Sequence, residues 1–355
     1  NTSLKIVHNQ LKYNFDVNVC YGKLPNIYGN KNELSQVILN LIINASQAVE
    51  NKRGKIDIFS DFDGKKITIC VQDNGKGIRP DNIERIFNPF FTTKEVGRGT
   101  GLGLSIAGMK AVVEMQFADF VSTGFNPIVN LLAKSHYRWS EKADVVVRMP
   151  CGGGTQAGPF HSQTNEAWFT KTPGLKVVYP SFPYDAKGLL NESINDPNPV
   201  MFFEHKQLYR SVYQDVPVDY YTIPFGKASL IKEGNDVTVI SFGAGVHWAL
   251  DTLNKNPEIS ADLIDLRTLQ PLDVETIYAS VKKTNKVIIL TEDTLFGGVA
   301  SDISAMIMEN CFEHLDAPVR RVGSIESAIP FVKALEDQYL PKVRFEEQLK
   351  ELLAY

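Results

Sequence analysis

The sequence predicts an α/β protein with an α+β part at its N-terminus. Between residues 32 and 103, one amphipathic helical pattern is followed by two strand-like runs and by glycine-rich stretches at 73–77 and 97–103. From about residue 110, short β-branched runs alternate with helical stretches, a rhythm typical of βαβ units around a parallel sheet. The change indicates two folds in a chain of 355 residues, which is long enough for two or three domains.

The first expected element is a helix over residues 32–50. Its apolar residues follow the 3,4 spacing of one buried face, and they are Leu34, Val37, Ile38, Leu41, Ile42, Ala45, Ala48 and Val49. Two strands should follow over 55–62 and 66–72, joined by a hairpin turn at Asp63-Gly64. In the second strand, alternation turns Ile67, Ile69 and Val71 inward.

The later elements follow from β-branched runs and from glycines. Strands are expected over 111–115, 144–149, 176–179, 200–204, 236–242, 261–266 and 286–291. Helices should open at Gly243–Gly245 and at Gly297-Gly298. The segment 208–225 has two prolines, weak periodicity and many tyrosines, so it is interpreted as a connection between domains.

Composition excludes several classes of protein. The hydrophobic fraction of 43% and charged fraction of 22% are those of a soluble globular protein, and the net charge of -4 gives no reason to expect nucleic acid. The four cysteines form no CxxC pair and are expected to be reduced thiols in a cytoplasmic protein. No apolar run approaches the ~20 residues of a membrane span, and no signal-peptide pattern is seen. Because no initiator Met is present, we expect a fragment or a processed product.

Two asparagines in the first helix are candidate metal ligands. Asn40 and Asn44 are four residues apart and share one helix face. Mid-helix asparagine is unfavourable unless its amide has a partner, and its carbonyl oxygen suits Mg²⁺. Two solvated asparagines on the outer face would give the same pattern.

Glycine-rich stretches after the hairpin suit a nucleotide. The Asp73 carboxylate, at a strand end, can accept a hydrogen bond from an adenine amino group, and Gly75 and Gly77 let backbone approach a flat base. The same residues also suit a plain tight turn. Backbone N–H groups in a later stretch can cradle phosphates; the residues concerned are Lys94, Gly97, Gly99, Thr100, Gly101, Leu102 and Gly103. A flexible linker would explain that stretch alone equally well.

Taken in order, these elements over residues 1–106 resemble the N, G1, F and G2 boxes of the ATPase domain of sensor histidine kinases. The resemblance implies an ATP site in which Asn44 holds Mg²⁺ with Asn40 beside it, and Asp73 reads adenine. Lys94 and residues 97–103 would form the lid over the phosphates. No HExxxP-like phosphoacceptor motif is present, so kinase activity is not expected. The family's continuation after GLGLSI is also missing, which implies a truncated ATPase sandwich.

Residues 107–355 resemble the β subunit of the thiamine-diphosphate-dependent 2-oxoacid dehydrogenases that act on pyruvate or branched-chain oxoacids. The resemblance is carried by AGMKAVVEMQFADF, RMPCGGG, HSQTNEAWF, YPSFPYDAKGLL, EHKQLYR, DLRTLQPLD and EDTLFGGVASDI. It implies that Phe120 covers the pyrimidine ring of the cofactor, with Gln116 as its polar neighbour. His161 would handle protons or the acyl group on its way to lipoamide, a task that suits imidazole. A core aromatic, a surface glutamine and a backbone-bonded loop histidine are the plain structural alternatives.

The same resemblance implies domains and partners. A partial pyrimidine-binding domain would span 107–207 and a linker 208–225. A transketolase C-terminal-type domain would span 226–355 and serve in assembly. Thiamine diphosphate would be shared with an α subunit, in a homodimer or an α2β2-type assembly that contacts the lipoyl acyltransferase core. Carbonyls in the 174–200 region are a further option for K⁺. The family's pyrimidine-activating glutamate lies upstream of the matched region, so the single chain is expected to be impaired.

Both resemblances stop near Ile106, where neither a complete domain nor an exposed linker is recognisable between 100 and 112. The simplest account is a chimera; a hybrid fold in which residues 99–112 serve both parts is the alternative. Three functions follow: an impaired β-type dehydrogenase subunit, an ATP-binding signalling module, or a non-catalytic assembly domain.

Overall fold

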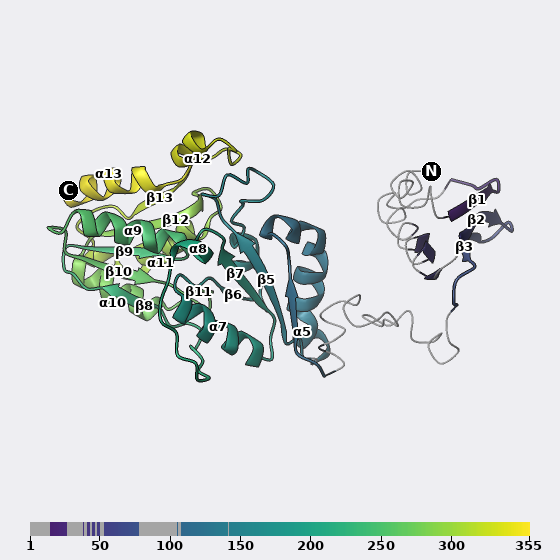
Figure 1. The fold of residues 1–355 in the computed structure, drawn as a ribbon, viewed down its shortest axis with the longest axis horizontal. Coiled ribbons are helices and arrows are strands. Elements are labelled where there is room, and N and C mark those ends of the chain that lie inside the picture. The colour runs from purple at the N-terminus through teal and green to yellow at the C-terminus, as the bar shows by residue number, and fades with distance from the viewer. Residues whose placement is uncertain are drawn as a thin grey trace. The chain divides into compact units, whose positions relative to one another are not determined.

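The structure is a computed structural model that describes residues 15–26, 38, 41–42, 45–46, 48–49, 53–77, 105, 108–140 and 142–355. The chain divides into two compact units, Asn1–Phe91 and Thr92–Tyr355, and each is described by itself (Figure 1). No helix among the described residues is both long enough and apolar enough to cross a bilayer.

The first unit contains a three-stranded sheet in the order β1-β2-β3. Its strands are β1 (Phe15–Tyr21), β2 (Gly54–Phe62) and β3 (Ile67–Asp73). The predicted hairpin is confirmed, because β2 and β3 pair antiparallel. The Asp63 carboxylate accepts the backbone N–H groups of Lys65 at 2.8 Å and Lys66 at 2.7 Å, and Gly64 takes the positive φ of the turn. Strand β1, which pairs parallel with β2, was not predicted.

A small apolar core lies between this sheet and the predicted helix. Of the described residues within the predicted 32–50 range, Val49 is not helical, so the prediction is wrong there; those that are helical are Ile38, Leu41, Ile42, Ala45, Ser46 and Ala48. Ile42 and Ala45 pack against Ile56 and Ile58 of β2. The prediction for Leu41 is wrong, since 43% of this residue is exposed. Leu41 precedes Ile42 by one position, and one residue turns the helix by about 100°, which carries Leu41 off the buried face. Leu34, Val37, Asn40 and Asn44 lie outside the described residues.

The second unit begins with a five-stranded sheet in the order β11-β6-β7-β5-β4. Strands β4 (Ala111–Glu114), β5 (Val145–Cys151), β7 (Val200–His205) and β6 (Lys176–Val178) are parallel, which confirms the predicted parallel sheet. Strand β11 (Thr268–Gln270) pairs antiparallel with β6, although it comes from far along the chain. The helices of this part are η1 (Ala118–Gly124), η2 (Pro127–Leu131), η3 (Leu132–Lys134), α5 (Ser135–Trp139), α6 (Ala167–Thr170), α7 (Pro183–Asn195) and α8 (Leu208–Ser211).

A second five-stranded sheet has the order β13-β12-β9-β10-β8. Its strands are β8 (Ser229–Lys232), β9 (Val237–Ser241), β10 (Ala261–Asp265), β12 (Val287–Thr294) and β13 (Arg320–Ser324). All pairs are parallel except β10 with β8. The helices are α9 (Ala244–Lys255), α10 (Val274–Thr284), α11 (Val299–Cys311), η4 (Phe312–His314), α12 (Lys333–Tyr339) and α13 (Lys342–Leu353). Both predicted helix starts are confirmed, since α9 follows Gly243 and α11 follows Gly298.

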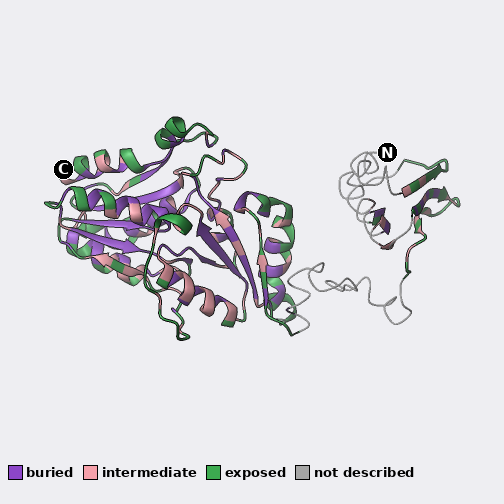
Figure 2. Ribbon diagram, in the orientation of Figure 1, coloured by how far each residue is buried: buried purple, intermediate pink, exposed green. Residues whose placement is uncertain are grey.

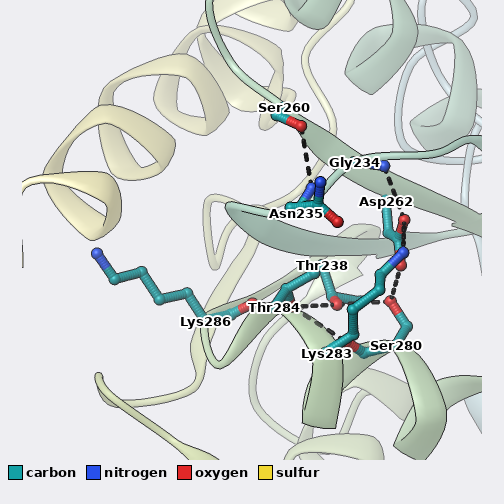
Figure 3. A network of polar contacts seen from close by, with 9 residues as sticks. All are labelled: Gly234, Asn235, Thr238, Ser260, Asp262, Ser280, Lys283, Thr284 and Lys286. Atoms are coloured by element: carbon teal, nitrogen blue, oxygen red, sulfur yellow. Dashed lines mark hydrogen bonds and ion pairs between the residues drawn. The ribbon is translucent and has the colours of Figure 1, made fainter.

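Strands β9 and β10 are buried along their whole length, as expected for a parallel sheet covered on both faces (Figure 2). A polar network fixes α10 to this sheet (Figure 3). The buried Asp262 carboxylate accepts hydrogen bonds from Ser280 Oγ and Lys283 Nζ, both at 2.6 Å, and from the Gly234 N–H at 2.9 Å. Thr238 Oγ1 lies 2.6 Å from Ser280 Oγ, so the buried polar groups have partners.

The predicted connection 208–225 begins with α8 and then lies against α7. Tyr221 stacks on Tyr184 with ring centroids 4.6 Å apart, and the Ile223 N–H donates to the Gly188 carbonyl at 3.2 Å. Lys187 Nζ donates to the Asp219 carbonyl at 2.9 Å. The connection is therefore bound to α7 by several contacts along its length.

Candidate functional site

The clearest candidate site is an aromatic cluster between the end of β4 and the loop after β5. His161 meets Phe117 edge-on at 4.8 Å and Phe120 at 5.5 Å between ring centroids. The two phenylalanines are 5.6 Å apart. Phe120 is 37% exposed, His161 is half-buried, and Gln116 is exposed on the same segment. The structure thus brings together Phe120 and His161, which lie 41 positions apart in the chain.

Hydrogen bonds tie the two segments of this cluster to each other. The Gln163 N–H donates to Asp119 Oδ1 at 3.2 Å, and Asn165 Nδ2 donates to the Ala118 carbonyl at 3.0 Å. Asp119 and Asn165 are both buried, and Asp119 Oδ2 and Asn165 Oδ1 have no protein partner among the described residues. The segment that carries Phe120 is therefore held against the segment that follows His161.

Lys206, which was not predicted from the sequence, contacts two residues of the cluster, His161 and Phe117. Its Nζ donates to the backbone carbonyl of His161 and lies 5.2 Å from the centre of the Phe117 ring. Burial lowers the pKa of the Lys206 ammonium, while Cys151 and the Asp119 carboxylate oppose that shift. Lys206 directly follows β7. Because α/β proteins place functional groups at the carboxyl ends of parallel strands, this position was a signal from which Lys206 could have been predicted.

Three carboxyl groups interact with one another near this cluster: Glu166 and Glu292, which are buried, and Asp293, which is half-buried. Burial, followed by the charge of Asp293, raises the pKa of Glu166 well above its ordinary value. Burial also raises the pKa of Asp293 to about 6. Glu292 accepts from His205 Nε2 at 2.6 Å in a buried pair. None of these carboxylates was singled out from the sequence.

The first unit contains part of the predicted nucleotide site. Asp73 ends β3, and one of its carboxylate oxygens accepts the Gly75 N–H at 2.8 Å. A Cβ at Gly75 would lie 2.5 Å from the Ala48 carbonyl oxygen, so only glycine fits there. The Lys76 N–H donates to that same carbonyl at 3.0 Å, and Gly77 has a φ of +69°. This turn is thereby tied to the described helical segment that contains Ala48.

The other predicted nucleotide ligands lie outside the described residues. They are Asn40, Asn44, Lys94, Gly97, Gly99, Thr100, Gly101, Leu102 and Gly103. Within the described part of the chain, no cluster of three or more His, Cys, Asp or Glu side chains could hold a metal ion.

Family models match three regions of the chain. The model described as transketolase, C-terminal domain, matches residues 226–344, and the transketolase pyrimidine-binding domain matches residues 97–212. The model described as histidine kinase-, DNA gyrase B- and HSP90-like ATPase matches residues 29–150. A solved chain described as a split gene transketolase, inactive β4 tetramer, aligns with a TM-score of 0.58 at 18% identity, covering 99% of this chain and 96% of that one. The second unit is therefore a transketolase-like α/β protein.

Sequence relatives narrow this class. The chain is 45% identical over 249 residues to the 2-oxoisovalerate dehydrogenase subunit beta of Bacillus subtilis, covering 68% of this chain and 76% of the relative. It is 43% identical to the corresponding mitochondrial subunit of Dictyostelium discoideum, covering 76% of this chain and 74% of the relative. It is 39% identical to the pyruvate dehydrogenase E1 component subunit beta of Staphylococcus epidermidis, covering 77% and 85%. The chain belongs to the family of 2-oxoacid dehydrogenase β subunits.

An ATPase match precedes this family region, so the chain combines parts of two unrelated families. Residues 97–150 are matched by both the ATPase model and the pyrimidine-binding model. In the structure, the later part of this overlap forms β4 and most of β5, which belong to the transketolase-like sheet.

Proposed function

We propose that residues 107–355 act as the β-type part of a 2-oxoacid dehydrogenase. The reaction would be oxidative decarboxylation of pyruvate or a branched-chain 2-oxoacid, with acyl transfer to lipoamide. An α-type subunit would complete the thiamine diphosphate site and supply the Mg²⁺ ligands. The observation that carries this proposal is the partly exposed Phe120 ring beside His161, with Lys206 behind them.

The residues of the cluster fit a flat heteroaromatic ring. The exposed part of Phe120 offers an apolar surface for stacking, and the exposed Gln116 side chain can hydrogen-bond to a ring edge. When bound, thiamine diphosphate supplies the electron sink for decarboxylation. His161 would donate or accept a proton at the reacting oxygen of the acyl group, and Lys206 would hold the His161 backbone.

Binding and turnover with an added α-type subunit test this proposal. The variants are Phe120→Ala and His161→Gln, and the matched controls are the exposed Phe312→Ala and His136→Gln. We expect Phe120→Ala to weaken thiamine diphosphate binding by about threefold to tenfold, the scale of one lost ring stack. We expect His161→Gln to lower kcat by about 10²-fold, as for the loss of one proton-transfer group. Equal behaviour of variants and controls would refute the assignment.

Finer details of the assembly belong to the same proposal. We propose that the chain forms a homodimer or an α2β2-type assembly that docks on a lipoyl acyltransferase core. A K⁺ ion would bind carbonyls of the 174–200 region, and the protein would be cytoplasmic. We expect low turnover from the single chain, because the glutamate that activates the pyrimidine ring in this family is not among the residues that carry the resemblance.

We also propose that the first unit binds ATP with Mg²⁺. The specific support is the turn at Asp73, where one carboxylate oxygen accepts the Gly75 N–H and the other can accept from an adenine amino group. Titration with a non-hydrolysable ATP analogue tests this. Asp73→Asn should abolish binding, whereas the control Asp61→Asn, an exposed change on β2, should leave it unchanged. Unaltered affinity in Asp73→Asn would remove the adenine assignment.

A further inference from the structure

The loop between β5 and His161 has an unusual backbone. Gly152, Gly154, Gln156 and Gly158 all have positive φ, at 88°, 78°, 57° and 69°. Left-handed residues in a loop of this kind curve the chain so that several backbone N–H groups can point to one side, which creates a concave site for an anion. A run of glycines makes this conformation accessible, because most side chains disfavour it.

Two carboxylates occupy this concave face. Glu292 Oε1 accepts the Gly153 N–H at 2.6 Å. The two oxygens of Glu336 accept the N–H groups of Gly154 at 2.8 Å and Gln156 at 3.0 Å. Glu292 lies in β12 and Glu336 in α12, so both belong to the C-terminal part of the second unit. Glu336 is 1% exposed, and charge-assisted hydrogen bonds at such depth are strong.

Glu292 also contacts His205, the last residue of β7, which directly precedes Lys206. Its Oε2 lies 2.6 Å from His205 Nε2, and His205 Nδ1 accepts the Gln207 N–H at 3.3 Å. Nε2 therefore carries the ring proton and donates it to Glu292. The next residue, Lys206, donates to the His161 carbonyl. Glu292 thus connects the glycine loop with the segment that contains Lys206, whose Nζ donates to the His161 carbonyl at the end of the loop.

The loop also leaves no room for a side chain at two of its glycines. A Cβ at Gly152 would lie 2.1 Å from His205 Nε2, and a Cβ at Gly158 would lie 2.3 Å from the Phe331 ring. At the end of the loop, the His161 N–H donates to the Gly158 carbonyl at 3.4 Å. The position of His161 consequently depends on the C-terminal part of the unit.

We propose that Glu336 and Glu292 are positioning residues for His161, acting as fixed anions that hold the backbone amides of residues 153–156. This inference rests on the proposed function for the role of His161, but the loop contacts themselves do not. It also changes the role expected for residues 226–355, which would shape the site in addition to assembling subunits.

Glu336→Gln in the full chain tests the proposal, because it keeps the shape of the side chain and removes its charge. The control is Glu326→Gln at an exposed position in the same region. We expect the amides of residues 153–156 to exchange with deuterium at least tenfold faster in Glu336→Gln, with no change in β9 or β10. The imidazole NMR signals of His161, which sense the edge-on rings of Phe117 and Phe120, should move toward those of a free histidine.

A second variant approaches the same contact from the loop. Gly154→Ala is strained by its positive φ, and its Cβ would lie 2.9 Å from Gln207 Oε1. We expect it to cause the same changes at His161, and the double variant to add little to either single one. Faster exchange and shifted His161 signals support the proposal, even if no variant, nor the parent chain, shows thiamine-dependent turnover. A folded Glu336→Gln protein with parental exchange and unchanged His161 signals overturns it, whatever the turnover.

Discussion

The described parts of the two units differ in how much apolar surface their sheets bury. In the described part of the first unit, the core consists of Ile42, Ala45, Ile56 and Ile58 with a few half-buried neighbours. In the second unit, strands such as β9 and β10 are buried along their whole length, and one cluster alone includes Phe345, Trp248 and Leu253. Since burial of apolar surface is the main favourable term in folding, the second unit should be the more stable one.

All three tryptophans (Trp139, Trp168 and Trp248) lie in the second unit, so their fluorescence reports its unfolding alone. Isoleucine methyl NMR signals from Ile56 and Ile58 can report on the first unit. The comparison can therefore be tested within one molecule.

The largest expected effect is on the second unit. Phe345, in α13, is fully buried, and Phe345→Ala should lower the free energy of unfolding by about 3–5 kcal/mol, the usual range for this change in a core. Val343→Ala on the exposed side of the same helix should change it by less than about 0.5 kcal/mol. Urea denaturation followed by tryptophan fluorescence measures both. Similar losses in the two variants would contradict the packing described for α13.

The next largest effect is expected in the first unit, where a smaller loss of free energy should be enough to unfold the unit. Ile56→Ala removes one of its few fully buried side chains and should destabilise that unit by about 2–4 kcal/mol. Because the core in the described part of this unit is small, we expect the unit to unfold near 25 °C while tryptophan fluorescence stays unchanged. Methyl NMR spectra measure this. Retained Ile58 signals in the variant would show that the first unit is more stable than its core suggests.

Individual carboxyl groups of the two units should contribute to the pH dependence of stability with opposite signs. Burial, followed by the charge of Asp185, raises the pKa of Asp265 to about 7 from an ordinary 3.8. A raised folded-state pKa means that this contribution is fully present below pH 3.8 and is lost as pH rises through about 7. Asp265→Asn should therefore flatten the decline of stability between those pH values. A parental slope in that variant would assign the decline to another group.

In the first unit, a hydrogen bond from Asn18 Nδ2 lowers the pKa of Asp57, and backbone N–H groups of Lys66 and Lys65 lower that of Asp63. Contributions of this sign are present above the ordinary pKa and are lost as pH falls through the folded-state value. Acid titration of the Ile56 and Ile58 methyl signals should show unfolding promoted by low pH. Asn18→Ala should weaken the dependence, and Asn130→Ala, a second-unit change, should not.

The smallest effect is expected at the surface of the second unit. Lys333 and Asp337 form an exposed pair one helical turn apart in α12, with Nζ and Oδ2 2.5 Å apart. Lys333→Met should change the free energy of unfolding by less than about 0.5 kcal/mol, because solvent screens such pairs. A change above about 1 kcal/mol would indicate that α12 is held more by its surface charges than by the buried Glu336.

Turns and helix starts could be predicted from the sequence where the backbone conformation of a few neighbouring residues determines them. The Asp63-Gly64 turn and the glycines before α9 and α11 depend on backbone conformation, and each marked its element correctly. Strand β1 was missed, although Phe15 and Val17 alternate with exposed Asp16 and Asn18, because only two of its positions face the core. Leu41 was misassigned because a pattern of apolar residues alone cannot show how wide the buried face is.

The candidate site was only partly predictable. Phe120 and His161 were named through a family resemblance, and the structure brings them together. Lys206, Glu292 and Glu336 were not found, since their partners lie 45, 139 and 182 positions away along the chain. Hydrogen bonds between such distant segments leave no periodic pattern in a single sequence.

Strand β11 has a consequence for synthesis of the chain. It contributes residues 268–270 to the edge of a sheet whose other strands end by residue 205. While the ribosome is still translating the intervening residues, β6 must expose an unpaired edge, and such edges invite association with other nascent chains. Premature termination anywhere before residue 270 would therefore release a product whose first large sheet can never be closed on that side.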